Sequence, residues 1–331
     1  MQIYQTNYQK EIAELYPTKL DFETIAHQRG LIKSQEENFN FYRTIMGDEG
    51  ETTVIDYLQT YGKKHWIVLK NFWQNYSGRF ETDIILFTRH KGYAIEIKNY
   101  KGEYSYNDGI IKINGRIRSA NPFHQARRAY TNLENICLDH SYPTKFQGVV
   151  IFAGVDNHVE IHSEMTDLEI IPRTRLLTFI EKIVKEEEQY TGEPLNIKKI
   201  IHYLEKYETK NDYLPVPMNQ EKMSTVRKGI SCMNCQSYSV INKKHKVVCK
   251  KCKNIEIREE AVVRSICEYG ILNFKSHLTM KGLLDFFAGQ LSRSYLTKII
   301  KKHFEVVENG SHSYIINKKF PFPTISKQFK F

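Results

Sequence analysis

The alternation of hydrophobic and polar positions predicts a mixed α/β unit over residues 1–208. Short β-rich runs occupy residues 65–69, 79–87, 93–97 and 109–113, and a strongly apolar strand follows at 147–154. Helical patterns cover residues 34–44 and 51–61 on either side of a break at 47–50, and two amphipathic helices at 176–188 and 195–207 close the unit. A further helix starts after Asn121, the N-cap, with Pro122 as its first residue, and runs to about residue 140. We expect residues 109–113 to continue the same sheet as the preceding strands.

The remaining residues predict a linker and two small modules. Asn, Asp and Pro interrupt any periodicity over residues 209–230, and residues 231–258 hold two cysteine pairs. Three helices follow at 259–272, 280–288 and 292–303, and Asn309-Gly310 then joins two β runs as in a hairpin. This order resembles a winged helix, whose third helix enters the major groove of DNA. A small helical domain that binds a protein or the N-terminal unit is the alternative.

The four paired cysteines indicate a metal site. Their two CxxC motifs are separated by 13 residues, which leaves room for a β-hairpin built from residues 238–241 and 247–248. Four thiolates suit tetrahedral Zn²⁺, so the segment resembles a zinc ribbon with a closed, structural site. A redox CxxC and an iron–sulfur site remain open alternatives. The expected zinc ligands are Cys232, Cys235, Cys249 and Cys252.

The charge balance favours a polyanionic partner. The chain of 331 residues carries 48 Lys and Arg against 38 Asp and Glu, a formal net charge of +10, and residues 221–258 alone hold ten basic residues against two Glu. Lysines that neutralise phosphates release counterions and add affinity that does not depend on sequence. A merely solvated face is the alternative. The candidate nucleic-acid contacts here are Lys243, Lys244, Lys246, Lys250 and Lys251, with Arg293, Lys298, Lys301 and Lys302 on the third helix.

No apolar run is long enough for a membrane helix, and the N-terminus lacks an export pattern. We therefore expect a cytoplasmic protein without a membrane partner.

Two carboxylates and a lysine form the most informative pattern in the chain. Glu96 and Lys98 point to the same side of their strand, and pairing with residues 79–87 as a hairpin would bring Asp83 close to Glu96. Two adjacent carboxylates bind a hard cation such as Mg²⁺, and a lysine beside them can activate water and offset charge on a phosphate. Metal, lysine and water are the parts needed for phosphodiester hydrolysis. An ordinary cross-strand ion pair between Asp83 and Lys98 is the alternative.

Residues 45–140 resemble the nuclease-related domain (NERD), a branch of the PD-(D/E)XK nuclease superfamily. The resemblance rests on an ordered set of residues: Gly50-Glu51, Asp83, Glu96-Ile97-Lys98, Asn121-Pro122 and Gln125. It implies a mixed-sheet, restriction-endonuclease-like core whose metal ligands are Asp83, Glu96 and the Ile97 carbonyl. It also implies that Lys98 positions or activates the attacking water, that Glu51 completes the site from its helix and that Gln125 lies at the edge near DNA. We add Arg127 and Arg128, next to Gln125, as candidate phosphate contacts.

Together these patterns predict a three-part protein. The parts are a nuclease domain at 1–208 with its core at about 45–160, a zinc ribbon at 231–258 after the linker, and a winged-helix-like module at 259–331. The predicted activity is Mg²⁺- or Mn²⁺-dependent hydrolysis of DNA, with the small modules binding the substrate. The alternatives are a catalytically silent nuclease fold that acts as a DNA-binding regulator or scaffold, and a protein directed at RNA. Nucleases of this kind often pair, so a homodimer is possible.

Overall fold

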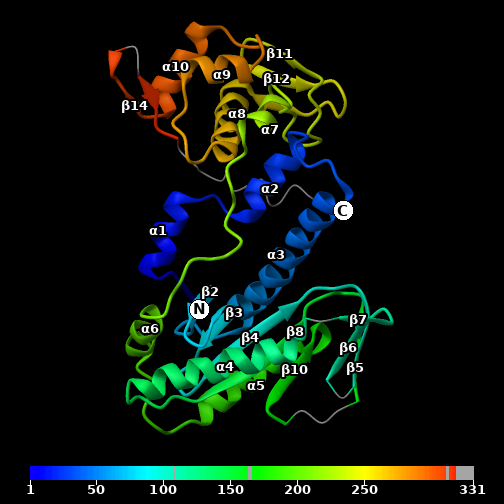
Figure 1. The fold of residues 1–331 in the computed structure, drawn as a ribbon, viewed down its shortest axis with the longest axis vertical. Coiled ribbons are helices and arrows are strands. Elements are labelled where there is room, and N and C mark those ends of the chain that lie inside the picture. The colour runs from blue at the N-terminus through cyan, green and yellow to red at the C-terminus, as the bar shows by residue number, and fades with distance from the viewer. Residues whose placement is uncertain (108, 119, 163–165, 311–312, 318–331) are drawn as a thin grey trace. The chain divides into compact units, whose positions relative to one another are not determined.

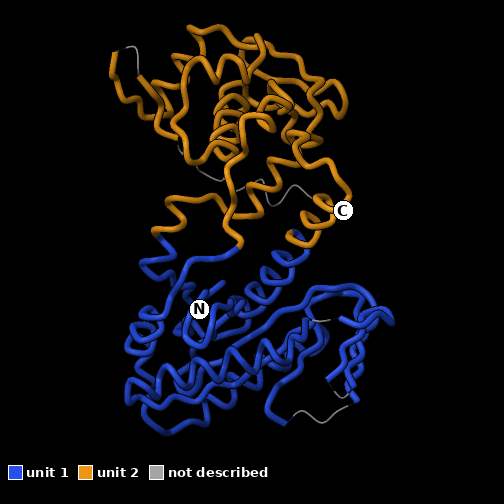
Figure 2. The backbone as a smooth tube through the Cα atoms, in the orientation of Figure 1, with its two compact units in different colours: residues 1–10, 45–212 blue, residues 11–44, 213–331 orange. Residues whose placement is uncertain are grey.

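A computed structural model describes residues 1–107, 109–118, 120–162, 166–310 and 313–317. The chain divides into two compact units, residues 1–10 with 45–212 and residues 11–44 with 213–331 (Figure 2). Residues 11–44 thus group with the C-terminal part of the chain, whereas the sequence patterns assign all of residues 1–208 to one unit. Residues 318–331, which the sequence assigns to the C-terminal module, lie outside the described residues.

A six-stranded mixed sheet forms the centre of the first unit (Figure 1). Its order is β1-β2-β3-β4-β8-β10. β3 is antiparallel to both β2 and β4, whereas β1 is parallel to β2, β8 to β4 and β10 to β8. The bounds are β1 Gln2–Tyr4, β2 Ile67–Asn75, β3 Arg79–Phe87, β4 Gly92–Lys98, β8 Phe146–Phe152 and β10 Leu168–Pro172.

Helices cover both faces of this sheet. Val54 and Leu58 of α3 (Gln35–Tyr61) share one apolar cluster with α5 (Leu176–Gln189) and with Ile84 of β3. On the other face Leu133 of α4 (Pro122–Asp139) packs with α6 (Ile197–Glu205) and with Ile85 of the same strand. Successive residues of β3 therefore point to opposite helical layers, as strand geometry requires. Burying each such side chain contributes roughly 1.5–3 kcal/mol.

A second sheet stands apart from the first, in the order β7-β6-β5-β9. The prediction that residues 109–113 continue the main sheet is wrong. β4 already has β3 on one side and β8 on the other, so the chain that leaves β4 finds no free edge there. Gly102, with φ of +105°, begins the new direction. The bounds are β5 Gly102–Asn107, β6 Ile110–Ile113, β7 Arg116–Arg118 and β9 Asn157–Ile161; the short 3-10 helix Arg173–Arg175 follows β10.

The helix α3 runs without interruption over 27 residues, so the predicted break at residues 47–50 is wrong. A glycine inside a helix costs only about 1 kcal/mol relative to alanine, which the packing of the Val54 turn can offset. The predicted start of α4 is confirmed, because the Asn121 side chain accepts hydrogen bonds from the first backbone N–H groups and Pro122 follows. Among the described residues, every helix is too short or too polar to cross a membrane.

The second unit contains the three helices and the hairpin that the sequence predicts. Phe22 and Ile25 of α2 pack in one core with Ile266 of α8 and Leu296 of α10, and this shared core places residues 11–44 in the unit. The helices are α2 Lys19–Gln28, α7 Gln220–Ser224, α8 Arg258–Leu272, α9 Met280–Phe286 and α10 Arg293–His303. α1 (Asn7–Leu15) lies across the boundary between the units along the chain. The strands are β11 Val240–Asn242, β12 Lys246–Cys249, β13 Ile255–Ile257, β14 Val306–Val307 and β15 Tyr314–Ile315.

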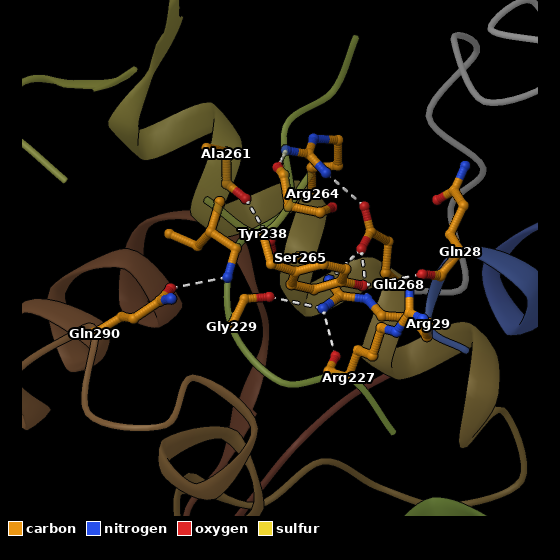
Figure 3. Close-up of polar contacts among 12 residues, drawn as sticks. Gln28, Arg29, Arg227, Gly229, Tyr238, Ala261, Arg264, Ser265, Glu268 and Gln290 are labelled. Carbon is orange, nitrogen blue, oxygen red and sulfur yellow. Dashed lines mark hydrogen bonds and ion pairs between the residues drawn. The ribbon is translucent and has the colours of Figure 1, made fainter. Parts of the chain in front are cut away.

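A buried ion-pair network joins the end of α2 to α8 within this unit (Figure 3). It extends from α8 to β13. The Arg29 guanidinium, which is fully buried, pairs with Glu268 and donates to the carbonyl oxygen of Gly229 at 2.6 Å. Arg264 reaches the other Glu268 oxygen at 2.6 Å and the Glu256 carboxylate at 2.8 Å. Burial alone would raise the pKa of Glu268, but the two guanidinium groups hold it below its usual value. The charges are therefore compensated, as buried charges must be.

Candidate active site and metal centre

β3 and β4 separate at the point where Asp83 and Glu96 would face each other. Regular pairing runs from Phe87 opposite Gly92 to Ile84 opposite Ile95 and goes no further. Beyond it, the Asp83 carboxylate accepts a hydrogen bond from the backbone N–H of Ile97 at 2.7 Å. The side chain of one strand thus fixes the peptide of the next. The sequence predicts that Asp83 and Glu96 approach each other here, and the Asp83 charge does act on Glu96.

Glu96 and Lys98 lie side by side on the same face of β4, with 2.5 Å between the Glu96 Oε1 and Lys98 Nζ atoms. Both side chains are largely buried, with 6% and 16% of their surface exposed. Burial and the nearby Asp83 charge raise the pKa of Glu96 to about 8. Burial alone would lower the pKa of Lys98, but the two carboxylates raise it to about 12, so Lys98 is a cation at neutral pH. The ion pair of Lys98 is formed with Glu96 on its own strand.

Glu51 approaches this end of the sheet from α3. Its Oε2 lies 3.7 Å from the ammonium of Lys70 on β2. Burial and the Asp83 charge raise the pKa of Glu51 to about 7. The structure therefore places Glu51 within the electrostatic reach of Asp83.

Glu81 is a carboxylate that the sequence analysis did not include in the site. It stands two residues before Asp83 on β3, and therefore on the same side of the strand. Burial, followed by the charges of Asp83 and Glu51, raises the pKa of Glu81 to about 8. Glu81 and Asp83 are two residues apart, as are Glu96 and Lys98. The same alternation rule could therefore have identified Glu81 from the sequence.

The donor chemistry of this site fits a hard divalent cation. Carboxylates that burial and mutual repulsion keep partly protonated would regain their charge beside a cation, and Mg²⁺ and Mn²⁺ prefer oxygen ligands. The candidate oxygen donors where β3 and β4 separate are Asp83, Glu96 and the Ile97 carbonyl. Over the described residues, however, only the four cysteines gather their ligand atoms within 4.8 Å of one another. The Asp83 carboxylate accepts from the Ile97 N–H, and the Glu96 carboxylate pairs with the Lys98 ammonium.

The three predicted contacts on α4 differ in their surroundings. Gln125 is exposed, and its side chain has no polar partner among the described residues. Arg127 is engaged by Asp167, with its Nε and Nη2 atoms 2.6 and 2.9 Å from the two carboxylate oxygens. Arg128 is exposed, donates to the Ser77 carbonyl oxygen at 3.1 Å and lies over the ring of Phe80. The structure thus does not bring Gln125 into contact with the carboxylates, and Arg127 already has an anionic partner.

The four cysteines of the second unit form a cluster suited to one metal ion. The Sγ atoms of Cys232 and Cys252 are 3.6 Å apart, and those of Cys235 and Cys249 are separated by the same distance. Zn–S bonds of about 2.3 Å in tetrahedral geometry place sulfur atoms about 3.8 Å apart, whereas a disulfide brings them to about 2.05 Å. The cluster could therefore hold zinc, and it supports the predicted zinc ribbon.

The two CxxC turns have the same backbone conformation. Gln236 and Lys253, each immediately after the second cysteine of its pair, have φ of +57° and +62°. Each N–H donates to the carbonyl oxygen of the first cysteine, Cys232 or Cys249, at 2.9 and 3.1 Å. The repeated turn directs two sulfur atoms from each loop to a common centre. Three strands support the loops, one more than the predicted hairpin, because β13 pairs with β12.

The predicted basic contacts of the second unit are all on its surface. Those of the ribbon lie in the turn between β11 and β12, on β12 itself and in the second cysteine loop. On α10, Lys302 pairs with Glu259 at 2.6 Å. The exposed residues are Lys243, Lys244, Lys246, Lys250, Lys251, Arg293, Lys298, Lys301 and Lys302.

The mixed sheet, with acidic residues and a lysine where two strands separate, gives the first unit a nuclease-like core. Residues 46–153 match the family model of the nuclease-related domain, and the chain therefore carries such a domain, as the resemblance predicts. The match covers about a third of the chain and includes the residues Glu51, Asp83, Glu96, Lys98 and Gln125. No curated protein and no solved structure is found to match the chain.

Proposed function

We propose that this protein is a metal-dependent nuclease that hydrolyses phosphodiester bonds in DNA. The observation that carries the proposal is the separation of β3 and β4, which leaves Asp83, Glu96 and Lys98 together at one sheet end. Strands that stayed paired would hold these groups in an ordinary ladder. The match to the nuclease-related domain supports the same activity.

Each residue of the site has a proposed task. A divalent cation held by Asp83, Glu96 and the Ile97 carbonyl would stabilise the negative charge that builds on the phosphate. Lys98 remains protonated in the buried site, so its ammonium orients water and offsets charge rather than acting as the first base. Glu51 supplies a further carboxylate from α3, and Gln125 is proposed to meet the substrate at the edge of the domain.

The second unit is proposed to bind the nucleic acid. The ribbon lysines and the exposed basic side chains of α10 offer phosphate contacts that depend on salt but not on sequence. In this proposal α8, α9, α10 and the β14–β15 hairpin act as a winged-helix-like module, with α10 as the helix that approaches the groove.

The test is a cleavage assay on supercoiled plasmid, linear duplex and single-stranded DNA with Mg²⁺ or Mn²⁺. Lys98→Ala should lower the rate by about 10²–10³-fold, the loss typical of removing one preorganised charge-stabilising group. Lys91→Ala is the matched control, because Lys91 precedes the opposite end of β4 and pairs with Glu186 at 3.6 Å. Cleavage by Lys98→Ala at the wild-type rate would refute the site assignment.

A catalytically silent fold that binds DNA is the second candidate. It is favoured by one observation, that the Lys98 ammonium lies 2.5 Å from a carboxylate oxygen of Glu96, one of the proposed metal ligands. Calorimetric titration with Mn²⁺ separates the two candidates. The nuclease should bind the ion in a manner that Asp83→Asn abolishes, whereas the silent fold should show no such Asp83-dependent binding.

A further inference from the structure

The outer face of the zinc-ribbon sheet carries an exposed row of isoleucines. Ile241 of β11 stands opposite Val248 of β12, and Val248 stands opposite Ile255 of β13. Directly paired residues project to the same face, and so does Ile257, two positions after Ile255. The exposed fractions of Ile241, Ile255 and Ile257 are 42%, 59% and 57%. We call this set, with Val248, the isoleucine face.

The opposite face of the same sheet is buried, so only one face of the sheet is exposed to solvent. Val247 packs in the core of the second unit, and Glu256 reaches the buried guanidinium of Arg264. Alternation along β12 and β13 therefore sends one set of residues to the core and leaves the isoleucine face outward. Apolar side chains gathered in this way are unusual on a surface that has no partner.

Lysines lie at one end of the isoleucine face. Lys246 lies on it, opposite Ile257 in the register, and Lys243 and Lys244 occupy the adjoining turn. No described carboxylate forms an ion pair with these three lysines, whereas Lys302 on α10 is paired with Glu259. Exposed isoleucines do not improve solubility, and a site that binds through charge alone does not require them. The isoleucines therefore indicate an apolar contact beside the lysines.

We propose that the isoleucine face binds single-stranded nucleic acid, with the isoleucines packing against unpaired bases and the lysines contacting phosphates. In a duplex the base faces are stacked and inaccessible, so only the lysines could make contacts, to phosphates. Isoleucines beside lysines therefore favour binding of unpaired strands. The inference rests on the proposed nucleic-acid function and names the form of nucleic acid that the ribbon takes. Lysine contacts alone would not distinguish the two forms.

The experiment measures the binding of the full chain by fluorescence anisotropy, without added Mg²⁺ or chelator. The probes are an oligothymidylate of about 16 nucleotides, the upper range for one small binding module, an abasic strand with the same phosphates, and a duplex of the same length. Wild type should bind the oligothymidylate more tightly than either of the others. The double variant Ile255→Ser with Ile257→Ser should bind the oligothymidylate about tenfold more weakly, which corresponds to roughly 1.4 kcal/mol of binding free energy. Its affinity for the abasic strand should not change.

Matched variants separate the two components of the face. Leu138→Ser is the control, because Leu138 is 60% exposed on α4, beside the acidic Asp139, and it should leave all affinities unchanged. Lys246→Ala should weaken binding to all three probes and lower the salt dependence, which counts phosphate contacts. Zinc content reports whether the ribbon remains folded in each variant.

Equal binding of the oligothymidylate and the abasic strand by the wild type would overturn the proposal. So would a change from dimer to monomer in the isoleucine variant, which would assign the face to a second copy of the chain. Failure of the nuclease proposal is distinguishable, because it shows as absent cleavage while base-dependent binding persists.

Discussion

Gly50 of α3 lies against Asn99, the residue that follows β4. A Cβ atom at residue 50 would come within 2.7 Å of the Asn99 Cβ, closer than real side-chain contacts allow. The Asn99 side chain in turn donates to the carbonyl oxygen of Met46, one turn earlier in the helix, at 2.7 Å. The helix is thereby fixed to the end of β4, and the next residue, Glu51, is brought to the carboxylates.

We predict that Gly50→Val lowers the stability of the first unit by about 1–3 kcal/mol, the usual cost of an overpacked contact. The helix must also move away from β4, which displaces Glu51 from the carboxylates. The rate of DNA cleavage by this variant should therefore fall. Gly47→Ala in the same helix is the control, since a Cβ there meets no atom within 4 Å, and it should gain about 0.5–1 kcal/mol. Thermal unfolding and the plasmid assay measure both effects. A Gly50→Val variant as stable as wild type would contradict the close packing.

The buried Arg29–Glu268 pair predicts a strong dependence of the second unit on α2. Arg29→Met should destabilise this unit by about 3–5 kcal/mol, because it leaves part of the Glu268 charge without compensation. Lys302→Ala breaks a pair on the surface and should cost less than about 1 kcal/mol. Hydrogen exchange of the α8 amides measures the local effect, which is needed because a two-unit chain need not unfold in one step. Equal protection in the two variants would refute the prediction.

Removal of one cysteine ligand should empty the metal site. Cys252→Ser leaves three thiolates of the cluster, and we expect it to be isolated without zinc, whereas the wild type should be isolated with one zinc ion per chain. Loss of the metal should also loosen β11–β13, seen as faster amide exchange there. Cys137→Ser is the control, because Cys137 is buried on α4 and lies outside the cluster. Iron bound in place of zinc would favour the iron–sulfur alternative.

The stability of the first unit should depend on pH through Glu208. Thr6 donates to one of its carboxylate oxygens at 2.8 Å, and the other is buried without a partner among the described residues. Burial and the neighbouring Glu205 raise the pKa of Glu208 from 4.5 to about 7, with the Thr6 bond acting the other way. Between pH 4.5 and 7 the folded chain therefore binds a proton that the unfolded chain has lost, so stability falls as pH rises through this window.

Glu208→Gln should remove this part of the pH dependence. The variant should melt at a higher temperature relative to wild type at pH 8 than at pH 4, since only the higher pH charges the buried wild-type carboxyl. Glu193→Gln, an exposed position in the same unit, should leave the difference near zero. Parallel melting curves for wild type and Glu208→Gln across the whole range would show that the buried carboxyl has no such effect.

Local patterns in the sequence determined much of this protein. Asn121 and Pro122 fix the start of α4 through bonds made within one turn, and the alternation of apolar residues places β3 and β4. Two CxxC turns carry the information for their own conformation, so the cysteine cluster could be predicted from spacing alone. The order of acidic residues and lysine likewise indicated the nuclease-related domain.

Contacts between distant segments decided the rest. The grouping of residues 11–44 with the C-terminal unit depends on the core that Phe22 shares with α8, and the continuity of α3 depends on packing that outweighs two glycines. The pairing of Arg127 with Asp167 and the charge environment of Glu81 likewise arise only when strands and helices meet. Hydrogen bonds and repeated turns that involve only a few consecutive residues can be predicted from the local sequence. Burial and charge compensation depend on which distant residues become neighbours in the folded chain.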